Sequence, residues 1–127
     1  MVQAAVDHAN EIGVKVNVAV CDAGGHLLAF QRMTGAFLDS IDIAQDKAWC
    51  SVSFGMPTSQ WAEIFKADPV LKDGLLGVPR LTALGGGIPI EWQGERVGGI
   101  GVSGASEAQD AACAEAALAK LESLLGD

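Results

Sequence analysis

The segment from residue 85 to residue 104 reads GGGIPIEWQGERVGGIGVSG, and it places two apolar runs on either side of a glycine-containing turn at 93–95. Two such runs around a short turn predict a β-hairpin. We therefore expect strands over residues 88–92 and 96–102. Pro89 suits the start of a strand or an edge strand, because proline cannot donate a ladder hydrogen bond.

A second hairpin is predicted nearer the N-terminus. Valines alternate with other residues from Val14 to Cys21, which is typical of a strand with one apolar face. The turn residues 22–25 follow, and residues 26–32 are expected to return as the partner strand. A further short strand is expected over residues 81–84, just before the three glycines.

Helices are predicted in the remaining segments from apolar periodicity and from start and stop signals. The first covers the first dozen residues and ends at Gly13, and the second begins at Asp39 or Ser40 and ends at Phe54. Another is expected over 60–67, and a last, alanine-rich helix over 106–125 begins with a capping-box pattern. For residues 70–80 the sequence predicts no regular element.

This order of elements predicts an α/β fold of the α+β type. We expect α-β-α layers in which helices cover a five-stranded, mainly antiparallel sheet. The 127 residues suffice for one core and are too few for two, so we expect one domain over residues 1–127.

Charge and hydropathy exclude several function classes. Sixteen acidic and eight basic residues give a net charge of −8, and the basic residues are scattered. Nucleic acids and anionic membranes both require clustered cations, so neither partner is expected. No stretch approaches the roughly 18 apolar residues of a membrane span, and no signal peptide is visible. We therefore expect a cytoplasmic protein.

The three cysteines, Cys21, Cys50 and Cys113, lie far apart in the sequence and form no C-x-x-C motif. This spacing predicts neither a disulfide framework nor a structural zinc site. Free thiols in a reducing compartment are the expected state.

Residues 99–104 match the pattern G-x-G-x-x-G. A dinucleotide-binding unit needs a further parallel strand after the following helix, and here the chain ends after that helix. Two interpretations remain open: backbone N–H groups near Gly101, Ser103 and Gly104 bind an anionic group, or the glycines serve only close packing.

Gly85, Gly86 and Gly87 form the second glycine cluster. Consecutive glycines cost folding entropy, so a tight turn or a close approach should require them. They either line a ligand cleft together with residues 98–104 or let neighbouring elements cross without side chains.

Few side chains stand out as reactive. His8 lies beside the apolar stripe of the first helix, and His26 begins a strand after a turn. His8 is therefore the first candidate to ligate a metal, although a single helix histidine is more often structural. Lys47 lies among small residues of the second helix, where it is either a surface lysine paired with a nearby acid or a pocket cation. Ser103 has no assignable histidine partner.

Four segments in one order carry a family resemblance: VAVCDAGGHL at 18–27, DKA at 46–48, GGGIPI at 85–90 and GGIGVSG at 98–104. Together they resemble the GlcG/HbpS-like family, which includes the C-terminal domain of PduO-type proteins. The resemblance implies an α-β-α fold with a five-stranded antiparallel sheet and assembly into homo-oligomers. It also implies haem binding or haem degradation in some members and accessory roles in catabolic gene clusters in others. The family's glycine-lined cleft maps to residues 85–87, Ser103 and Gly104, facing Lys47.

Three hypotheses follow. The first is a small-molecule-binding protein that holds haem or another planar anionic ligand, with His8 as iron ligand and Lys47 or Arg32 as counter-ion. The second is a small isomerase or lyase acting on a carboxylated metabolite, with Lys47 as acid/base or substrate anchor and Ser103 beside the oxyanion. The third is an assembly partner whose glycine-rich face packs on a sister subunit. Large aromatic side chains also favour a homo-oligomer: Trp49, Trp61, Phe65 and Trp92.

Overall fold

The computed structural model describes residues 1–126 and contains an antiparallel sheet with strand order β2-β1-β4-β3. The strands are β1 (Asn17–Asp22), β2 (Leu27–Arg32), β3 (Gly87–Trp92) and β4 (Glu95–Ser103). Each neighbouring pair is antiparallel, so both predicted hairpins are confirmed. In the central pair of strands, β1 and β4, Val18 lies opposite Val102 and Val20 lies opposite Ile100. These apolar side chains therefore share one face of the sheet.

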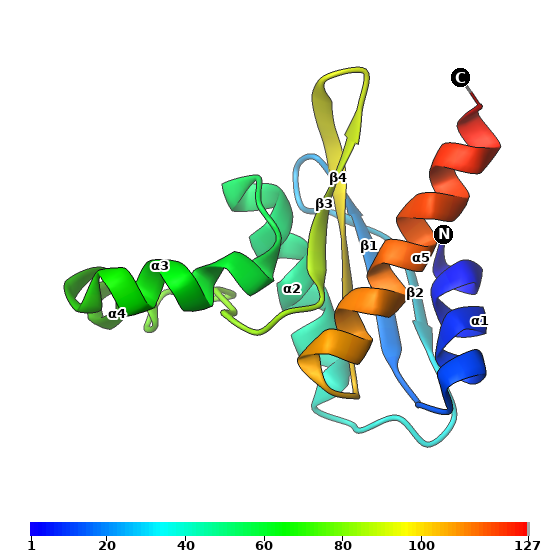
Figure 1. Cartoon of the computed structure of the whole chain (residues 1–127), viewed down its shortest axis with the longest axis horizontal. Coiled ribbons are helices and arrows are strands. Elements are labelled where there is room, and N and C mark those ends of the chain that lie inside the picture. Colours follow the sequence, from blue (N-terminus) through cyan, green and yellow to red (C-terminus); the bar gives the residue numbers. More distant parts are fainter. Residues whose placement is uncertain (127) are drawn as a thin grey trace.

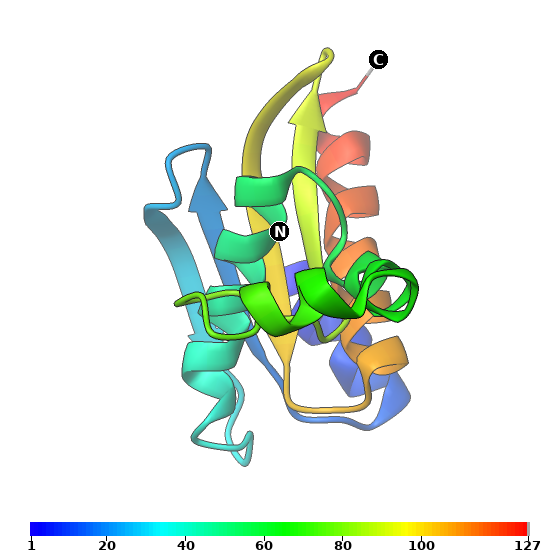
Figure 2. The same cartoon turned by 90° about the vertical axis from the view of Figure 1, so that its left-hand side faces the viewer.

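Helices cover both faces of this sheet (Figure 1). The helices α1 (Val2–Ile12) and α5 (Glu107–Leu125) lie side by side on one face, and α2 (Ser40–Phe54) lies on the other. Figure 2 shows the same three layers from the side of α2. The α-β-α arrangement expected from the sequence is therefore present.

The helix ends follow the expected signals. Gly13 and Gly55 end α1 and α2 in the left-handed conformation, with φ of 76° and 70°. The Ser106 side chain accepts from the Gln109 N–H, and the Gln109 side chain reaches back, so the capping box before α5 is confirmed.

The sheet has four strands, and the expectation of five is wrong. Residues 81–84 form no strand, because side chains rather than a neighbouring strand satisfy their backbone groups. The Cys50 thiol donates to the Thr82 carbonyl at 3.6 Å, and the Thr58 hydroxyl donates to the Leu84 carbonyl at 2.7 Å. The segment therefore runs beside α2 and the short 3-10 helix η1 (Thr58–Gln60) and does not join the sheet edge.

Two short helices follow η1. Helix α3 (Trp61–Ala67) matches the helix expected near 60–67, whereas α4 (Pro69–Leu75) lies where no element was predicted. The Asp68 carboxylate accepts from the Leu71 N–H, and Pro69 occupies the first turn, where its missing N–H costs no hydrogen bond.

Three buried clusters hold the layers together. The largest lies between the sheet and the α1–α5 pair, and a smaller one joins β1 to α2. The third contains Cys50, Trp61 and Phe65. Trp61 and Phe65 are thus covered within one chain, and they no longer argue for an oligomer.

None of the helices in residues 1–126 is long and apolar enough to cross a membrane.

Candidate functional site

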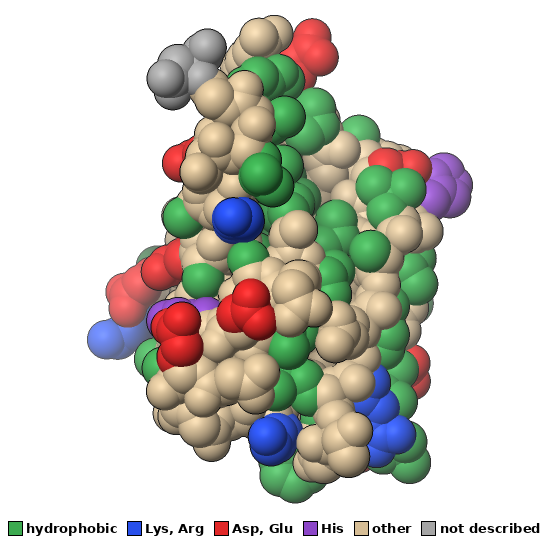
Figure 3. All heavy atoms as spheres, turned by 90° about the vertical axis from the view of Figure 1, so that its right-hand side faces the viewer, with side chains coloured by type: hydrophobic (Ala, Val, Ile, Leu, Met, Phe, Trp, Pro, Cys, Tyr) green, Lys and Arg blue, Asp and Glu red, His purple; other side chains and the backbone are tan. Residues whose placement is uncertain are grey.

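A groove of about 700 Å³ lies between α1 and α5, and we call it the α1/α5 groove. This volume lies within the usual range of small-molecule sites. Figure 3 shows the corresponding face of the molecule, where charged side chains are interspersed among hydrophobic ones. The lining residues come only from the two helices and Met1 before α1: Met1, Gln3, Ala4, Asp7, His8, Glu11, Ala116, Ala119, Lys120, Ser123 and Leu124.

His8 lies in this groove, and its side chain is 30% exposed. Its Nδ1 lies 3.6 Å from the Glu11 carboxylate, one helical turn further along α1. A carboxylate beside one ring nitrogen orients the imidazole and leaves the other nitrogen, Nε2, for a ligand. His8 therefore has the surroundings of a metal-ligating histidine.

Small side chains give the groove its width. Ala4 on α1 and Ala116 and Ala119 on α5 line it, while Ala5, Ala9 and Ala117 are buried beneath them. Lys120 adds one cation to the lining. The groove thus combines apolar walls with a single imidazole, one lysine and the two carboxylates of Asp7 and Glu11.

The donor set decides which kind of metal group fits. Among residues 1–126, no group of three or more His, Cys, Asp or Glu side chains is placed to hold a metal ion. A bare ion needs several protein ligands, whereas the porphyrin supplies four ligands to haem iron and leaves axial positions for one or two side chains. The residues of the α1/α5 groove therefore fit haem and do not fit a bare metal ion.

Lys47 lies elsewhere, in a buried ion pair. Its Nζ donates to Asp110 at 3.1 Å and to the Val102 carbonyl at 2.9 Å, so it ties α2 to β4 and α5. Burial lowers the pKa of Lys47, and Asp110 opposes that shift. Burial likewise raises the pKa of Asp110, and Lys47 opposes it. The second Asp110 oxygen accepts from the Ala105 N–H at 2.9 Å.

The glycine clusters surround this ion pair and pack tightly. A Cβ on Gly86 would lie 2.9 Å from the Lys47 Nζ, and one on Gly87 or Gly101 would collide with the backbone of α2. Gly104 has φ of 142° and abuts the backbone of Lys15. These contacts agree with the packing interpretation of both glycine clusters. Gly85 donates its N–H to the Glu107 carboxylate at 2.8 Å.

The predicted site residues therefore separate into distinct regions. Lys47 and Gly86 come together, Ser103 is buried at the end of β4, and Arg32 at the end of β2 donates to the Ala36 carbonyl. His8 lies on the far side of the sheet from α2, in the α1/α5 groove. Neither Lys47 nor Ser103 lines the α1/α5 groove. The enzyme hypothesis built on these two residues stays a prediction.

Sequence reasoning missed Asp110 and Lys120. No local pattern links Lys47 to Asp110, because 63 positions separate them. The signal for the groove was the spacing of small residues along α5, at Ala116, Ala119 and Ser123, opposite the His8 helix. An alanine-rich composition by itself is ordinary for a helix, so only the tertiary pairing of α1 with α5 makes this spacing informative.

Comparison with known proteins identifies relatives of this fold. The family model described as "Haem degrading protein HbpS-like" matches residues 1–119. Protein GlcG of Escherichia coli is 35% identical over 103 residues, which cover 81% of this chain and 75% of GlcG. The Corrinoid adenosyltransferase PduO of Salmonella typhimurium is 32% identical over 124 residues, 95% of this chain and 36% of PduO.

Solved structures give the same result. A double mutant of HbpS from Streptomyces reticuli has 39% identity and a TM-score of 0.85, with 99% of this chain and 82% of that chain covered. A PduOC:haem complex has 32% identity and a TM-score of 0.84, with 92% and 86% covered. The family match spans nearly the whole chain, and the fold agrees with it. The chain belongs to the HbpS-like family.

Proposed function

We propose that this protein binds haem in the α1/α5 groove, where His8 would ligate the iron through Nε2. The observation that carries the proposal is the position of His8, which lies beside Glu11 among the small side chains of the α1/α5 groove. The fit of the donor set and membership of a family that includes a haem complex both support it.

The residues around His8 have separate roles in this proposal. Ala116 and Ala119 leave space for a flat macrocycle, and Lys120 neutralises a propionate. The Glu11 carboxylate, 3.6 Å from Nδ1 of His8, favours a proton on that nitrogen and so the tautomer that presents a lone pair on Nε2. When bound, haem supplies redox and oxygen chemistry that no side chain offers.

The test is a titration of the purified protein with haemin, followed by absorption in the Soret region. For the wild type we expect a saturable, red-shifted band at one haem per chain. His8→Ala should weaken binding and alter the band, because an axial ligand changes both the affinity for haem and the electronic state of the iron.

His26→Ala is the matched control. This second histidine is on the surface, with its side chain 83% exposed and its Nδ1 3.3 Å from Asp22, and it lines no part of the groove. Its variant should bind haemin like the wild type. A His8→Ala protein with an unchanged band and affinity, or a wild type with no saturable band, would refute the proposal.

A further inference from the structure

Helices α3 and α4 form an arm that projects from the rest of the molecule (Figures 1 and 2). A hollow of about 440 Å³ lies where this arm meets the start of α5, and we call it the arm hollow. Its volume is within the usual range of small-molecule sites. Four separate parts of the chain line it: α3 with Ala62, Phe65 and Lys66, α4 with Lys72, the segment of Ala83 and Leu84, and α5 with Glu107.

The floor of the arm hollow is apolar and firmly held. Phe65 is buried, and its ring stacks on Trp61 with the two centroids 5.1 Å apart. Leu84 lines the same hollow and is 49% exposed, so an apolar surface remains open to solvent there. A ligand with an apolar body would remove this surface from water.

Two lysines border this floor without a counter-charge. Lys66 and Lys72 are exposed, and within residues 1–126 neither lies within ion-pair distance of a carboxylate. The acidic residues of α3 and α4 and of the turn between them do not line the hollow: Glu63, Asp68 and Asp73. In a chain with sixteen acidic and eight basic residues, two unpaired cations in one hollow are a specific feature.

Glu107 is the one acidic residue among the lining residues of the arm hollow. Its carboxylate accepts from the Gly85 N–H at 2.8 Å, so one of its oxygens is already bound within the chain. The lining therefore carries two positive charges and one negative charge. This balance favours an anionic ligand over a cationic one.

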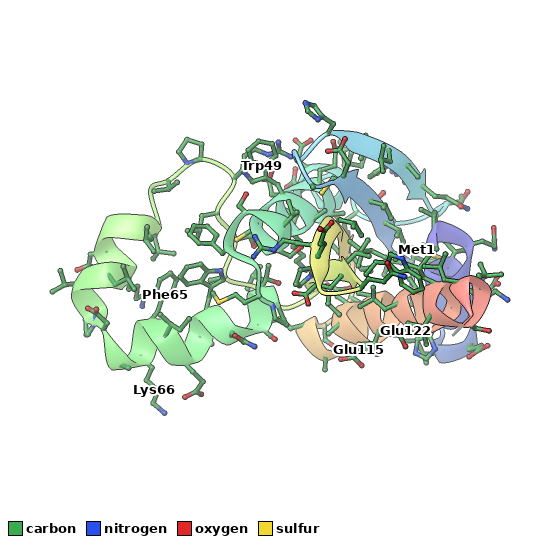
Figure 4. All side chains as sticks on the ribbon, turned by 90° about the horizontal axis from the view of Figure 1, so that it is seen from above. Met1, Trp49, Phe65, Lys66, Glu115 and Glu122 are labelled. Atoms are coloured by element: carbon green, nitrogen blue, oxygen red, sulfur yellow. The ribbon has the colours of Figure 1, made fainter. Side chains whose placement is uncertain are left out.

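We propose that the arm hollow binds a small organic anion, whose carboxylate or phosphate group lies between Lys66 and Lys72 and whose apolar body packs on Phe65. This site is separate from the α1/α5 groove. Figure 4 shows Phe65 and Lys66 toward one end of the molecule and Met1, which lines the α1/α5 groove, toward the other. The inference therefore does not depend on haem binding.

The test is a titration with phenyl phosphate, followed by NMR of the backbone amides, which gives both the affinity and the place of binding. We expect saturable shifts around Lys72 and Leu84 and none around His8. Inorganic phosphate lacks the apolar body and benzyl alcohol lacks the charge, so each should bind about tenfold more weakly. Benzoate replaces the phosphate by a carboxylate, and the tighter of the two aromatic anions identifies the preferred anionic group.

Variants of the lining test the role of each charge. Lys66→Gln and Lys72→Gln should each weaken phenyl phosphate binding about threefold, and the double variant about tenfold. Glu107→Gln should strengthen binding about threefold, because it removes a repelling charge and keeps an oxygen for the Gly85 N–H. Ala62→Trp fills the floor of the hollow and should abolish binding.

Each change has a matched control at an exposed position that does not line the arm hollow. Lys15→Gln and Glu63→Gln remove the same charges, and Ala67→Trp adds the same ring at the end of α3. These controls should bind phenyl phosphate like the wild type, and circular dichroism checks that every variant is folded. No saturable shifts around the hollow, equal affinity for inorganic phosphate, or an equal loss in Lys15→Gln and Lys66→Gln would each overturn the proposal.

Discussion

At the scale of single residues, the Lys47–Asp110 pair is the most unusual feature of the chain. A charged pair with both side chains almost fully covered contributes little net stability, because desolvation offsets most of the attraction. Removing one partner is different, since it leaves the other group buried without its counter-charge. The pair therefore fixes how α2, β4 and α5 fit together, and its loss should be measurable as unfolding free energy.

We expect Lys47→Met and Asp110→Asn each to lower the free energy of unfolding by about 3–5 kcal/mol. The double variant should lose clearly less than the sum, because neither charge is then left alone. Asparagine keeps an oxygen for the Ala105 N–H, so this hydrogen bond is preserved in the comparison. Urea denaturation of the four proteins measures the coupling, and strictly additive losses would contradict this account of the pair.

Cys113 gives a second prediction at this scale. The thiol is buried against the sheet, and burial raises its pKa to about 11. Only the thiolate reacts with alkylating reagents, so at pH 8 about one molecule in a thousand carries the reactive form. In the native protein, iodoacetamide at pH 8 should leave Cys113 unmodified over the time in which a free small-molecule thiol in the same solution reacts completely.

Mass spectrometry of the digested protein measures this modification site by site. The same treatment in urea is the control, and there all three cysteines should be labelled. Native labelling of Cys113 at the rate seen in urea would show that the thiol is not protected by the fold.

At the scale of elements, the glycines of β4 decide how closely α2 approaches the sheet. A Cβ on Gly101 would collide with the Ala44 carbonyl and the Ala48 amide, both of which belong to the helix backbone. Backbone cannot swing aside as a side chain can, so the two elements would have to separate. The G-x-G part of the 99–104 motif is therefore a packing device for a helix on a strand.

Gly101→Ala should accordingly lower the free energy of unfolding by about 3 kcal/mol, near the upper end for overpacking. Gly74→Ala in α4 is the matched control, because a methyl group added there would meet nothing within 4 Å and the φ of Gly74 is not positive. That substitution should raise stability by up to about 1 kcal/mol, through helix propensity. Urea denaturation compares the two, and equal effects would contradict the packing role of Gly101.

Elements bounded by strong local signals could be predicted from the sequence. The 85–104 hairpin, the glycine that ends α2 and the capping box of α5 all depend on residues a few positions apart. The prediction of a fifth strand was wrong because residues 81–84 are apolar in sequence and resemble a strand. Their hydrogen-bond partners, Cys50 and Thr58, lie about thirty positions away in the sequence. Local patterns carry no information on such partners.

At the scale of the whole molecule, the candidate site joins the two ends of the chain. His8 belongs to the first helix, and Ala116, Ala119 and Lys120 belong to the last. The sequence could identify His8 as the histidine beside an apolar stripe. It could not place α5 next to it, because that pairing depends on how both helices pack on one face of the sheet.

This placement predicts that haem stabilises the whole fold. A ligand held between the first and last helices binds only when both are docked, so it binds the native and not the unfolded state. With free haemin at about a hundred times the dissociation constant, the gain should be about 2.7 kcal/mol, seen as a rise in Tm. His8→Ala should lose most of this gain, as should Ala119→Trp, which fills the groove and leaves His8 in place.

Ala108→Trp, also on α5 and exposed but outside the groove, is the matched control and should keep the full rise in Tm. The two groove variants separate the iron ligand from the space for the macrocycle. Loss in His8→Ala alone would mean that haem is ligated by His8 but lies outside the groove. Loss in Ala119→Trp alone would mean that the groove holds the macrocycle while another residue ligates the iron. An equal rise in all four proteins would mean that haemin binds elsewhere on the chain, and the α1/α5 groove would then be a feature of helix packing without a ligand.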